Sequence, residues 1–129
     1  MNNIDQNFID DFISAYIEAA LWSIVDDNDD PLDNNYDETD IDVKTLEELK
    51  KECIDFIEYS TTLLEQADYK NAYSNAEMTG HDFWLTRNRN GAGFWDRGLG
   101  ELGNKLTEAS HCFGSLDLYV GDDGQLYAQ

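Results

Sequence analysis

The most informative shortage in this sequence is of positive charge. Only 8 Lys and Arg stand against 28 Asp and Glu, and the formal net charge is -20 at pH 7. Such a charge excludes direct binding of nucleic acid or of an anionic membrane surface, because both repel it. Self-repulsion on this scale also opposes a compact fold, so the charge itself is expected to serve a function. We expect basic protein surfaces as partners, and many of these hold nucleic acid.

The first 25 residues lack the features of an export signal or a membrane anchor. They contain four acids and no Lys or Arg. A signal peptide begins with positive charge, and a membrane span tolerates few charged residues. The sequence therefore predicts a cytoplasmic protein without membrane contact.

Cysteine and histidine are also scarce, with two residues of each. Cys53 and Cys112 lie far apart in the sequence, and in a reducing compartment we expect both to be free, buried thiols. No Cys or His spacing matches a zinc site. We therefore expect neither a metal nor another cofactor.

Glycine is missing from the first 79 residues, and all nine glycines lie between Gly80 and Gly124. Charge divides at nearly the same point. Residues 1–77 hold 21 acids and four Lys, a net charge of -17, whereas residues 78–129 hold seven acids and four basic residues, a net charge of -3. A chain of this length fits one domain. We expect a single domain, 1–129, with an acidic helical half and a glycine- and aromatic-rich α+β half.

Two helices are predicted in the acidic half. Apolar residues recur at helical spacing over residues 4–25, and any of three polar residues could cap the start, namely Asn2, Asn3 and Asp5. A second helix is predicted to begin at a capping box formed by Thr45 and Glu48. Its apolar stripe continues until the polar residues between 69 and 76, where we expect the helix to end.

Between these helices lies the acidic run, residues 26–42 (DDNDDPLDNNYDETDID), which holds nine carboxylates and no Lys or Arg. Its Asn and Asp content and Pro31 predict a loop. A loop of this length in a small domain is typical of a functional or mobile segment. Asp26, Asn28, Asp30 and Asp37 match positions one, three, five and twelve of a calcium loop, but Pro31 replaces the glycine that the sharp turn needs, and Asp37 is shorter than the usual closing Glu. Weak binding of divalent cations is the most that this pattern indicates.

The second half changes to a period typical of strands. Residues 81–87 and 93–97 are predicted to form a hairpin around an Asn-Gly turn. A helix is predicted over residues 99–109, and a last hairpin over 116–120 and 125–128. The predicted fold is α+β in the order α-α-β-β-α-β-β, with two hairpins that form a small antiparallel sheet packed with helices.

Residue types used in nucleophilic catalysis occur in this half, but nothing in their spacing orders them into nucleophile, base and orienting group. We therefore predict that the protein is not an enzyme. The three arginines are better explained as ion-pair partners, with Arg87 or Arg97 bound to Asp82 or Asp96.

The motifs HDFWxTRN, residues 81–88, and GAGFWDR, residues 91–97, carry a resemblance. The segment from Gly80 to Tyr127 is similar to the C-terminal part of a family of small, mostly uncharacterised proteins of bacteriophages and mobile elements. The family supplies no established catalytic residues. The resemblance implies a phage-related setting and hence the cytoplasm of a host cell. In such a setting, small acidic proteins often block host defence or host nucleic-acid enzymes.

Charge and setting together predict an inhibitor that mimics DNA. It would occupy the basic groove of a host defence or DNA-processing enzyme, such as a CRISPR effector or a restriction enzyme. Duplex DNA carries one charge per ~1.7 Å of axis, so 20 charges match roughly 34 Å of duplex. The predicted phosphate-mimicking residues are Asp26, Asp27, Asp29, Asp30, Asp33, Asp37, Glu38, Asp40, Asp42, Glu47, Glu48, Glu52, Asp55 and Glu58. The predicted aromatic anchors are Trp22, Tyr36 and Tyr59.

Two alternatives stay open. The apolar stripe of the first helix is broad for a helix that packs on one sheet, which indicates an acidic homodimeric interaction or assembly protein without mimicry. The imperfect calcium loop indicates a weak calcium-binding module.

Overall fold

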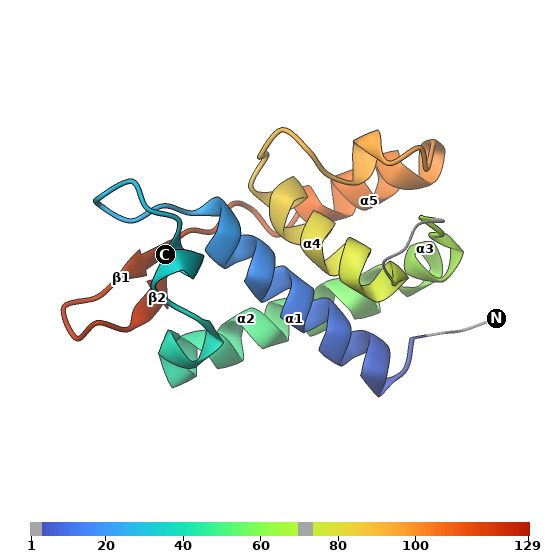
Figure 1. Cartoon of the computed structure of the whole chain (residues 1–129). Helices are drawn as coiled ribbons and strands as arrows, with labels where there is room; N and C mark the ends of the chain where they lie inside the picture. The colour runs from blue at the N-terminus through green and yellow to red at the C-terminus, as the bar shows by residue number, and fades with distance from the viewer. Residues whose placement is uncertain (1–3, 70–73) are drawn as a thin grey trace.

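The computed structural model describes residues 4–69 and 74–129 (Figure 1). Helices dominate it, and the strands form a short hairpin near the C-terminus. In chain order the elements are α1 (Gln6–Ser23), η1 (Leu32–Asn34), η2 (Glu38–Asp40), α2 (Val43–Tyr59), α3 (Thr61–Gln66), α4 (Asn75–Arg87), η3 (Phe94–Asp96), α5 (Glu101–His111), β1 (Leu118–Val120) and β2 (Leu126–Ala128). The fold is α+β with a small antiparallel sheet, as the sequence predicts.

Helix α1 lies at the centre of the molecule, between α2 and α4 (Figure 1). Asp5 caps it by accepting a hydrogen bond from the Phe8 N–H at 2.9 Å, so one of the predicted caps is confirmed. Asn2 and Asn3 lie outside the described residues. A side chain at Gly80 of α4 would place its Cβ 2.2 Å from the carbonyl oxygen of Phe12, so glycine lets the two helices touch through their backbones. The apolar stripe of α1 is therefore covered largely by α4, within the same chain.

Aromatic rings form the middle of the core. Phe56 of α2 stacks on Phe83 of α4, with ring centroids 4.0 Å apart and planes 13° apart. Phe12 of α1 and Phe113 after α5 contact the same pair of rings. The buried apolar residues of both halves of the chain belong to one cluster. Packing of aromatic faces and edges holds α1, α2 and α4 together.

The predicted bounds of the second helix are wrong. Helix α2 begins at Val43, because Asp42 caps it by accepting from the N–H and the Oγ1 hydroxyl of Thr45, at 3.1 and 3.2 Å. The helix ends at Tyr59, and α3 follows as a separate short helix. At this break the Thr61 hydroxyl donates to the carbonyl of Ile57 at 2.8 Å, a side-chain bond that competes with helical hydrogen bonding. Part of the predicted end, between residues 69 and 76, lies outside the described residues.

The first predicted hairpin is also wrong. Residues 81–87 belong to α4, and residues 93–97 contain the short helix η3. The segment from 82 to 87 is buried on every side, so no polar face reveals its helical period. The residues before this segment do indicate a helix. Ser74 Oγ accepts from the Glu77 N–H at 3.1 Å, and the Glu77 carboxylate accepts from the Ser74 N–H, so the two residues form a capping box at the start of α4.

The later predictions hold. Helix α5 occupies the predicted region, and β1 pairs with β2 in antiparallel register, with Tyr119 opposite Tyr127. Cys53 is buried and free as predicted, but Cys112 is free and exposed. The reason is its position, since it follows directly after the last residue of α5 at the surface.

Candidate partner-binding surface: the acidic end

Two segments far apart in sequence meet at one end of the molecule, and we call them together the acidic end. They are residues 26–42, with nine Asp and Glu, and residues 115–129, with three. Neither segment contains Lys or Arg. Ile41 forms a parallel bridge with Leu126, and the Asp42 N–H donates to the Leu126 carbonyl at 3.0 Å. The acidic run and the C-terminal hairpin therefore form one surface, on the left in Figure 1.

Carboxylates of the acidic run organise its own backbone. Asp26 Oδ1 accepts from the N–H of Asn28 at 2.8 Å and from the N–H of Asp30 at 3.1 Å. A main-chain bond from Asp26 to Asp30 and an isolated bridge between Val25 and Pro31 close the same turn. The first part of the predicted loop is therefore an ordered turn, because Asp side chains supply the acceptors that a turn needs.

The second part of the run is built in the same way. Asp37 caps η2 by accepting from the Thr39 N–H at 2.9 Å, and Asp40 accepts from the Asp37 N–H at 2.9 Å. Hydrogen bonds from the hydroxyl and the backbone N–H of Thr39 lower the pKa of Asp37. Asp42 then caps α2. Four of the nine carboxylates, those of Asp26, Asp37, Asp40 and Asp42, thus hold the run in shape by accepting backbone N–H bonds.

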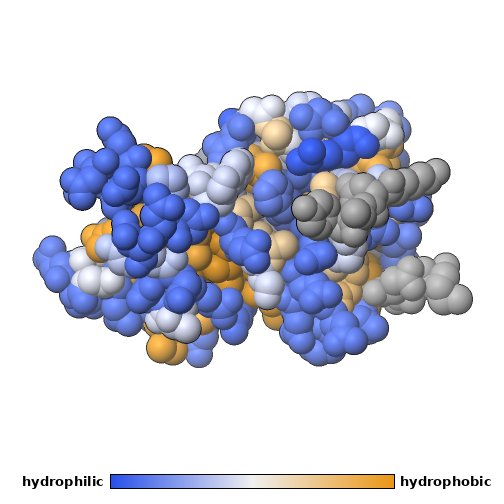
Figure 2. Space-filling model, viewed as in Figure 1, coloured by the Kyte–Doolittle hydropathy of each residue, from blue (hydrophilic) through white to orange (hydrophobic). Residues whose placement is uncertain are grey.

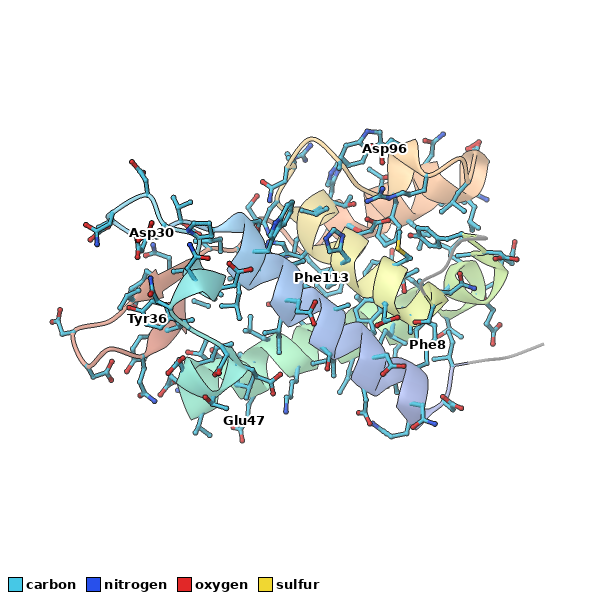
Figure 3. All side chains as sticks on the ribbon, viewed as in Figure 1. Phe8, Asp30, Tyr36, Glu47, Asp96 and Phe113 are labelled. Atoms are coloured by element: carbon cyan, nitrogen blue, oxygen red, sulfur yellow. The ribbon has the colours of Figure 1, made fainter. Side chains whose placement is uncertain are left out.

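The other five carboxylates of the run point into solvent. Within residues 4–69 and 74–129, none of them has a recorded hydrogen bond to its carboxylate or a cationic partner, and all five residues are exposed: Asp27, Asp29, Asp30, Asp33 and Glu38. Asp29 adopts a left-handed backbone conformation with φ of 64°, which Asp tolerates better than most residues. Figure 3 shows Asp30 at the outer edge of this turn.

The C-terminal hairpin adds carboxylates that the sequence analysis left out of the site. Asp123 accepts from the Gln125 N–H at 2.9 Å and from the Tyr127 hydroxyl at 2.5 Å. The hydrogen bond from Tyr127 lowers the pKa of Asp123, and the same bond raises the pKa of Tyr127 to about 12. Asp117 accepts from the Leu118 N–H at 2.9 Å. The Gly-Asp-Asp-Gly turn pattern carries no sign that it lies beside the acidic run, so sequence reasoning missed it.

The predicted phosphate mimics on α2 lie in a different setting. This helix carries five acids and three lysines, so its net charge is small. Glu52 binds the buried guanidinium of Arg87, and Asp55 pairs with Lys51 at 2.8 Å. The remaining three are exposed, namely Glu47, Glu48 and Glu58. Helix α2 is therefore the weaker part of the predicted negative surface.

The predicted aromatic anchors do not gather in one place. Trp22 is 59% exposed at the end of α1 and lies against the ring of His81, and Tyr59 is 69% exposed at the end of α2. Tyr36 is half-buried and belongs to the acidic end (Figure 3). Tyr119, with 43% exposure, lies on β1 of the same surface and was not predicted. Figure 2 shows this end as mostly hydrophilic, with hydrophobic patches between the polar side chains.

Buried ion pairs lie elsewhere, around α4. Arg97 donates to both carboxylate oxygens of Asp82, at 2.7 to 3.2 Å, which confirms one predicted pair, and Tyr69 donates to the same carboxylate at 2.9 Å. Burial opposes the charge of Asp82, but hydrogen bonds from His81, Arg97 and Tyr69 outweigh burial and lower the pKa of Asp82.

Arg87 is more deeply buried than Arg97, whose side chain is partly exposed. It donates to the Tyr16 hydroxyl, to the carbonyls of Gly114 and Phe113, and to Glu52, so its acidic partner is not one of the two predicted. Its guanidinium also lies over the ring of Phe83 at 5.5 Å. These contacts join α1, α2 and α4 to the chain that follows α5, which makes Arg87 a structural residue.

Across residues 4–69 and 74–129, no three His, Cys, Asp or Glu side chains converge closely enough to hold a metal ion. None of the helices in that part of the chain combines the length and apolar character needed to cross a membrane.

Comparison with known proteins returned no family model, no curated protein and no solved structure that matches this chain. The phage-related setting therefore stays a prediction, which rests on the sequence motifs of residues 81–97.

Proposed function

We propose that this protein is an inhibitor that mimics nucleic acid, and that its acidic end occupies the basic groove of a host defence or DNA-processing enzyme. The observation that carries the proposal is local composition: the two segments that meet at one end of the fold, 26–42 and 115–129, hold twelve carboxylates and no Lys or Arg. At one charge per ~1.7 Å of duplex axis, twelve charges match roughly 20 Å of DNA. This is a contact length that a nucleic-acid-binding groove can accept.

Order within the acidic run supports the proposal. Asp26, Asp37, Asp40 and Asp42 bind backbone N–H groups of their own segment, so the neighbouring exposed carboxylates project from a shaped surface. A surface that is shaped before binding loses less conformational entropy in the complex than a flexible acidic tail does. A phosphate backbone presents its charges in a similar way, at recurring positions along a stiff chain.

Apolar groups between the charges supply a second component. Tyr36 and Tyr119 lie among the carboxylates, and the exposed side chain of Val120 follows on β1. Charge steers association and selects basic partners, whereas aromatic and apolar anchors contribute most of the affinity in a desolvated interface.

The homodimeric alternative rested on the broad apolar stripe of α1. Burial of Phe12, Tyr16 and Ile17 within the chain accounts for that stripe without a second copy. The calcium alternative rested on Asp26, Asn28 and Asp30, and the carboxylate of Asp26 is engaged with backbone N–H groups. Neither alternative has a specific structural observation in its favour.

Displacement by DNA tests the proposal. The protein is immobilised, a bacterial lysate is passed over it, and bound proteins are challenged with short duplex DNA at constant ionic strength. We expect captured nucleic-acid-binding enzymes to be released by the DNA, because both ligands compete for one basic groove. Partners that stay bound in excess DNA would contradict mimicry.

The matched control is a triple variant, Asp27→Asn, Asp29→Asn and Asp33→Asn. None of these carboxylates has a recorded hydrogen bond in the described part of the chain, so the variant keeps the turn intact. It should capture the same enzymes about tenfold more weakly or worse, because exposed charges each contribute a modest part of the attraction.

A further inference from the structure

We propose that the acidic end binds an extended, lysine- or arginine-containing segment of its partner as an added β-strand along β1. This inference rests on the proposed function, which supplies the basic partner, and goes beyond it by naming the mode of contact. It depends on three features of the acidic end: a groove, a free strand edge and a set of carboxylates beside that edge.

The groove runs between the turn after α1 and strand β1. It consists of two adjoining hollows of about 490 Å³ each, and Val25 and Asp117 line both. One hollow is bordered by Asp26, Asp27 and Tyr36 on one side and by β1 on the other. The second hollow continues towards Asn88 and Asn90. Because they share Val25 and Asp117, they form one continuous groove along the turn after α1 and the chain that enters β1, and this groove can take an extended chain.

One wall of this groove is the edge of β1 that faces away from β2, and no other described strand pairs with that edge. Asp117 and Gln129 exchange both main-chain hydrogen bonds, and the Gly121 N–H donates to the Gln125 carbonyl at 2.7 Å. Antiparallel ladders alternate, so the N–H and C=O groups of Leu118 and Val120 point away from β2. The Leu118 N–H is occupied by the Asp117 carboxylate. Three groups remain for an added strand: the Val120 N–H as a donor, and the carbonyls of Val120 and Leu118 as acceptors.

The opposite wall also presents extended backbone. The Asp26 N–H donates to the Asp30 carbonyl and the Leu32 N–H to the Ile24 carbonyl, both at 2.8 Å. This pattern directs the N–H and C=O groups of Val25 away from its bridge partner, Pro31. The groove is thus bordered by main-chain groups on both sides.

Charge decides which chain fits. Asp26, Asp27 and Asp117 line the groove, and none of the described residues that line its two hollows is Lys or Arg. Lysine and arginine stems can pack on the exposed side chains of Val25 and Tyr119 while their charged heads reach the exposed carboxylate of Asp27. A second copy of this chain would bring the same carboxylates into the groove and would be repelled. A basic extended segment is therefore the occupant.

The test uses a short synthetic peptide of alternating lysine and valine. It is titrated into the full-length protein while amide signals are followed by NMR. We expect saturable shifts of the Val120 and Val25 signals, and slower hydrogen exchange of the Val120 amide. The matched probe is the same peptide methylated at alternate backbone nitrogens, which keeps its charge but lacks the N–H groups of one edge. It should bind about tenfold more weakly, because each lost hydrogen bond contributes modestly.

Charge is tested by one pair of variants. Asp27→Lys reverses a carboxylate in the groove, whereas Asp33→Lys makes the same change in net charge on a residue of the run that does not line it. The first should weaken peptide binding about tenfold and the second much less, because contact charges outweigh distant, screened ones.

Three results would overturn the inference: equal binding of the methylated peptide, equal effects of the two variants, or an unperturbed Val120 amide. Protection of Val120 together with dimer formation in the absence of peptide would also overturn it, because the occupant would then be a second copy. If the peptide fails to bind but DNA still displaces captured enzymes, the strand-pairing inference fails and the proposed function stands. If the peptide binds as expected but DNA displaces nothing, the proposed function fails.

Discussion

Carboxylates have opposite roles at the acidic end and around α4. Around α4, Asp82 is fully buried and bound by Arg97, and Glu52 is bound by the buried Arg87. At the acidic end twelve carboxylates share one surface without any Lys or Arg in the segments that form it. The first group stabilises the fold by pairing, whereas the exposed carboxylates of the second group, such as Asp27 and Asp33, oppose a compact fold through self-repulsion.

This difference explains why the total charge of the chain does not indicate which surface binds a partner. Two of the three arginines are used inside the fold, so they do not neutralise the surface. The lysines of α2 balance much of that helix. What distinguishes the acidic end is the local absence of cations, which becomes visible only when residues 26–42 and 115–129 are seen together.

The largest effect should come from removing the cation that joins most elements. Arg87→Ala should lower the free energy of unfolding by about 4 kcal/mol, because it leaves Glu52, the Tyr16 hydroxyl and two carbonyls without their donor. Chemical denaturation measures this value. Lys105→Ala, at an exposed position of α5, is the control and should change stability little. If both changes lower the free energy of unfolding by a similar amount, the proposed distinction between structural and surface charge is wrong.

Loss of the buried carboxylate should have the next largest effect. Asp82→Ala should lower the free energy of unfolding by about 3 kcal/mol, somewhat less than Arg87→Ala because Arg97 can turn towards solvent. The matched change at the acidic end, Asp33→Ala, should leave stability unchanged. A large loss for Asp33→Ala would mean that the acidic end also holds the fold together.

Acid should act through the same buried carboxylate. Hydrogen bonds from His81, Arg97 and Tyr69 lower the pKa of Asp82 in the folded state despite burial. Its contribution to stability is therefore complete above the unfolded value of about 3.9 and is lost as pH falls through the lower folded value. Denaturation curves near neutral pH and below about pH 3 should show this loss in the wild-type protein and a smaller loss in Asp82→Asn. Equal losses would assign acid sensitivity to other carboxylates.

The smallest effect on stability should come from neutralising the acidic end. The triple variant Asp27→Asn, Asp29→Asn and Asp33→Asn should keep or slightly raise the melting temperature, because it removes repulsion and no recorded hydrogen bond in the described residues. Calorimetry measures the change. A marked fall in melting temperature would show that these carboxylates are structural, and the comparison with α4 would fail.

Apolar spacing and turn residues within short stretches of the sequence predict much of the fold. The stripe of α1, the stripe of α5 and the turn of the last hairpin each predict the element that forms. Prediction failed where burial removes the pattern: residues 82–87 of α4 are all buried, so no polar face reveals the helical period, and their sequence alternates as a strand would. The capping box of Ser74 and Glu77 was the better guide.

The site was only half visible in the sequence. The acidic run is a local feature and can be read directly, but the adjacency of the hairpin carboxylates depends on the Ile41 to Leu126 bridge, a tertiary contact. Conversely, nothing in the sequence around Glu52 indicates that this acid pairs with the buried Arg87. Spacing along one chain cannot reveal which charges meet in space.

One measurement tests the central claim most directly: inhibition of DNA binding by a captured and purified target enzyme, compared among three forms of this protein. They are the wild type, the acidic-end triple variant, and an α2 variant with the same loss of charge, Glu47→Gln, Glu48→Gln and Glu58→Gln. Our account predicts an inhibition constant about tenfold or more weaker for the acidic-end variant and nearly unchanged for the α2 variant. Equal weakening would show that total charge matters more than this surface, and unchanged inhibition by the acidic-end variant would contradict the account.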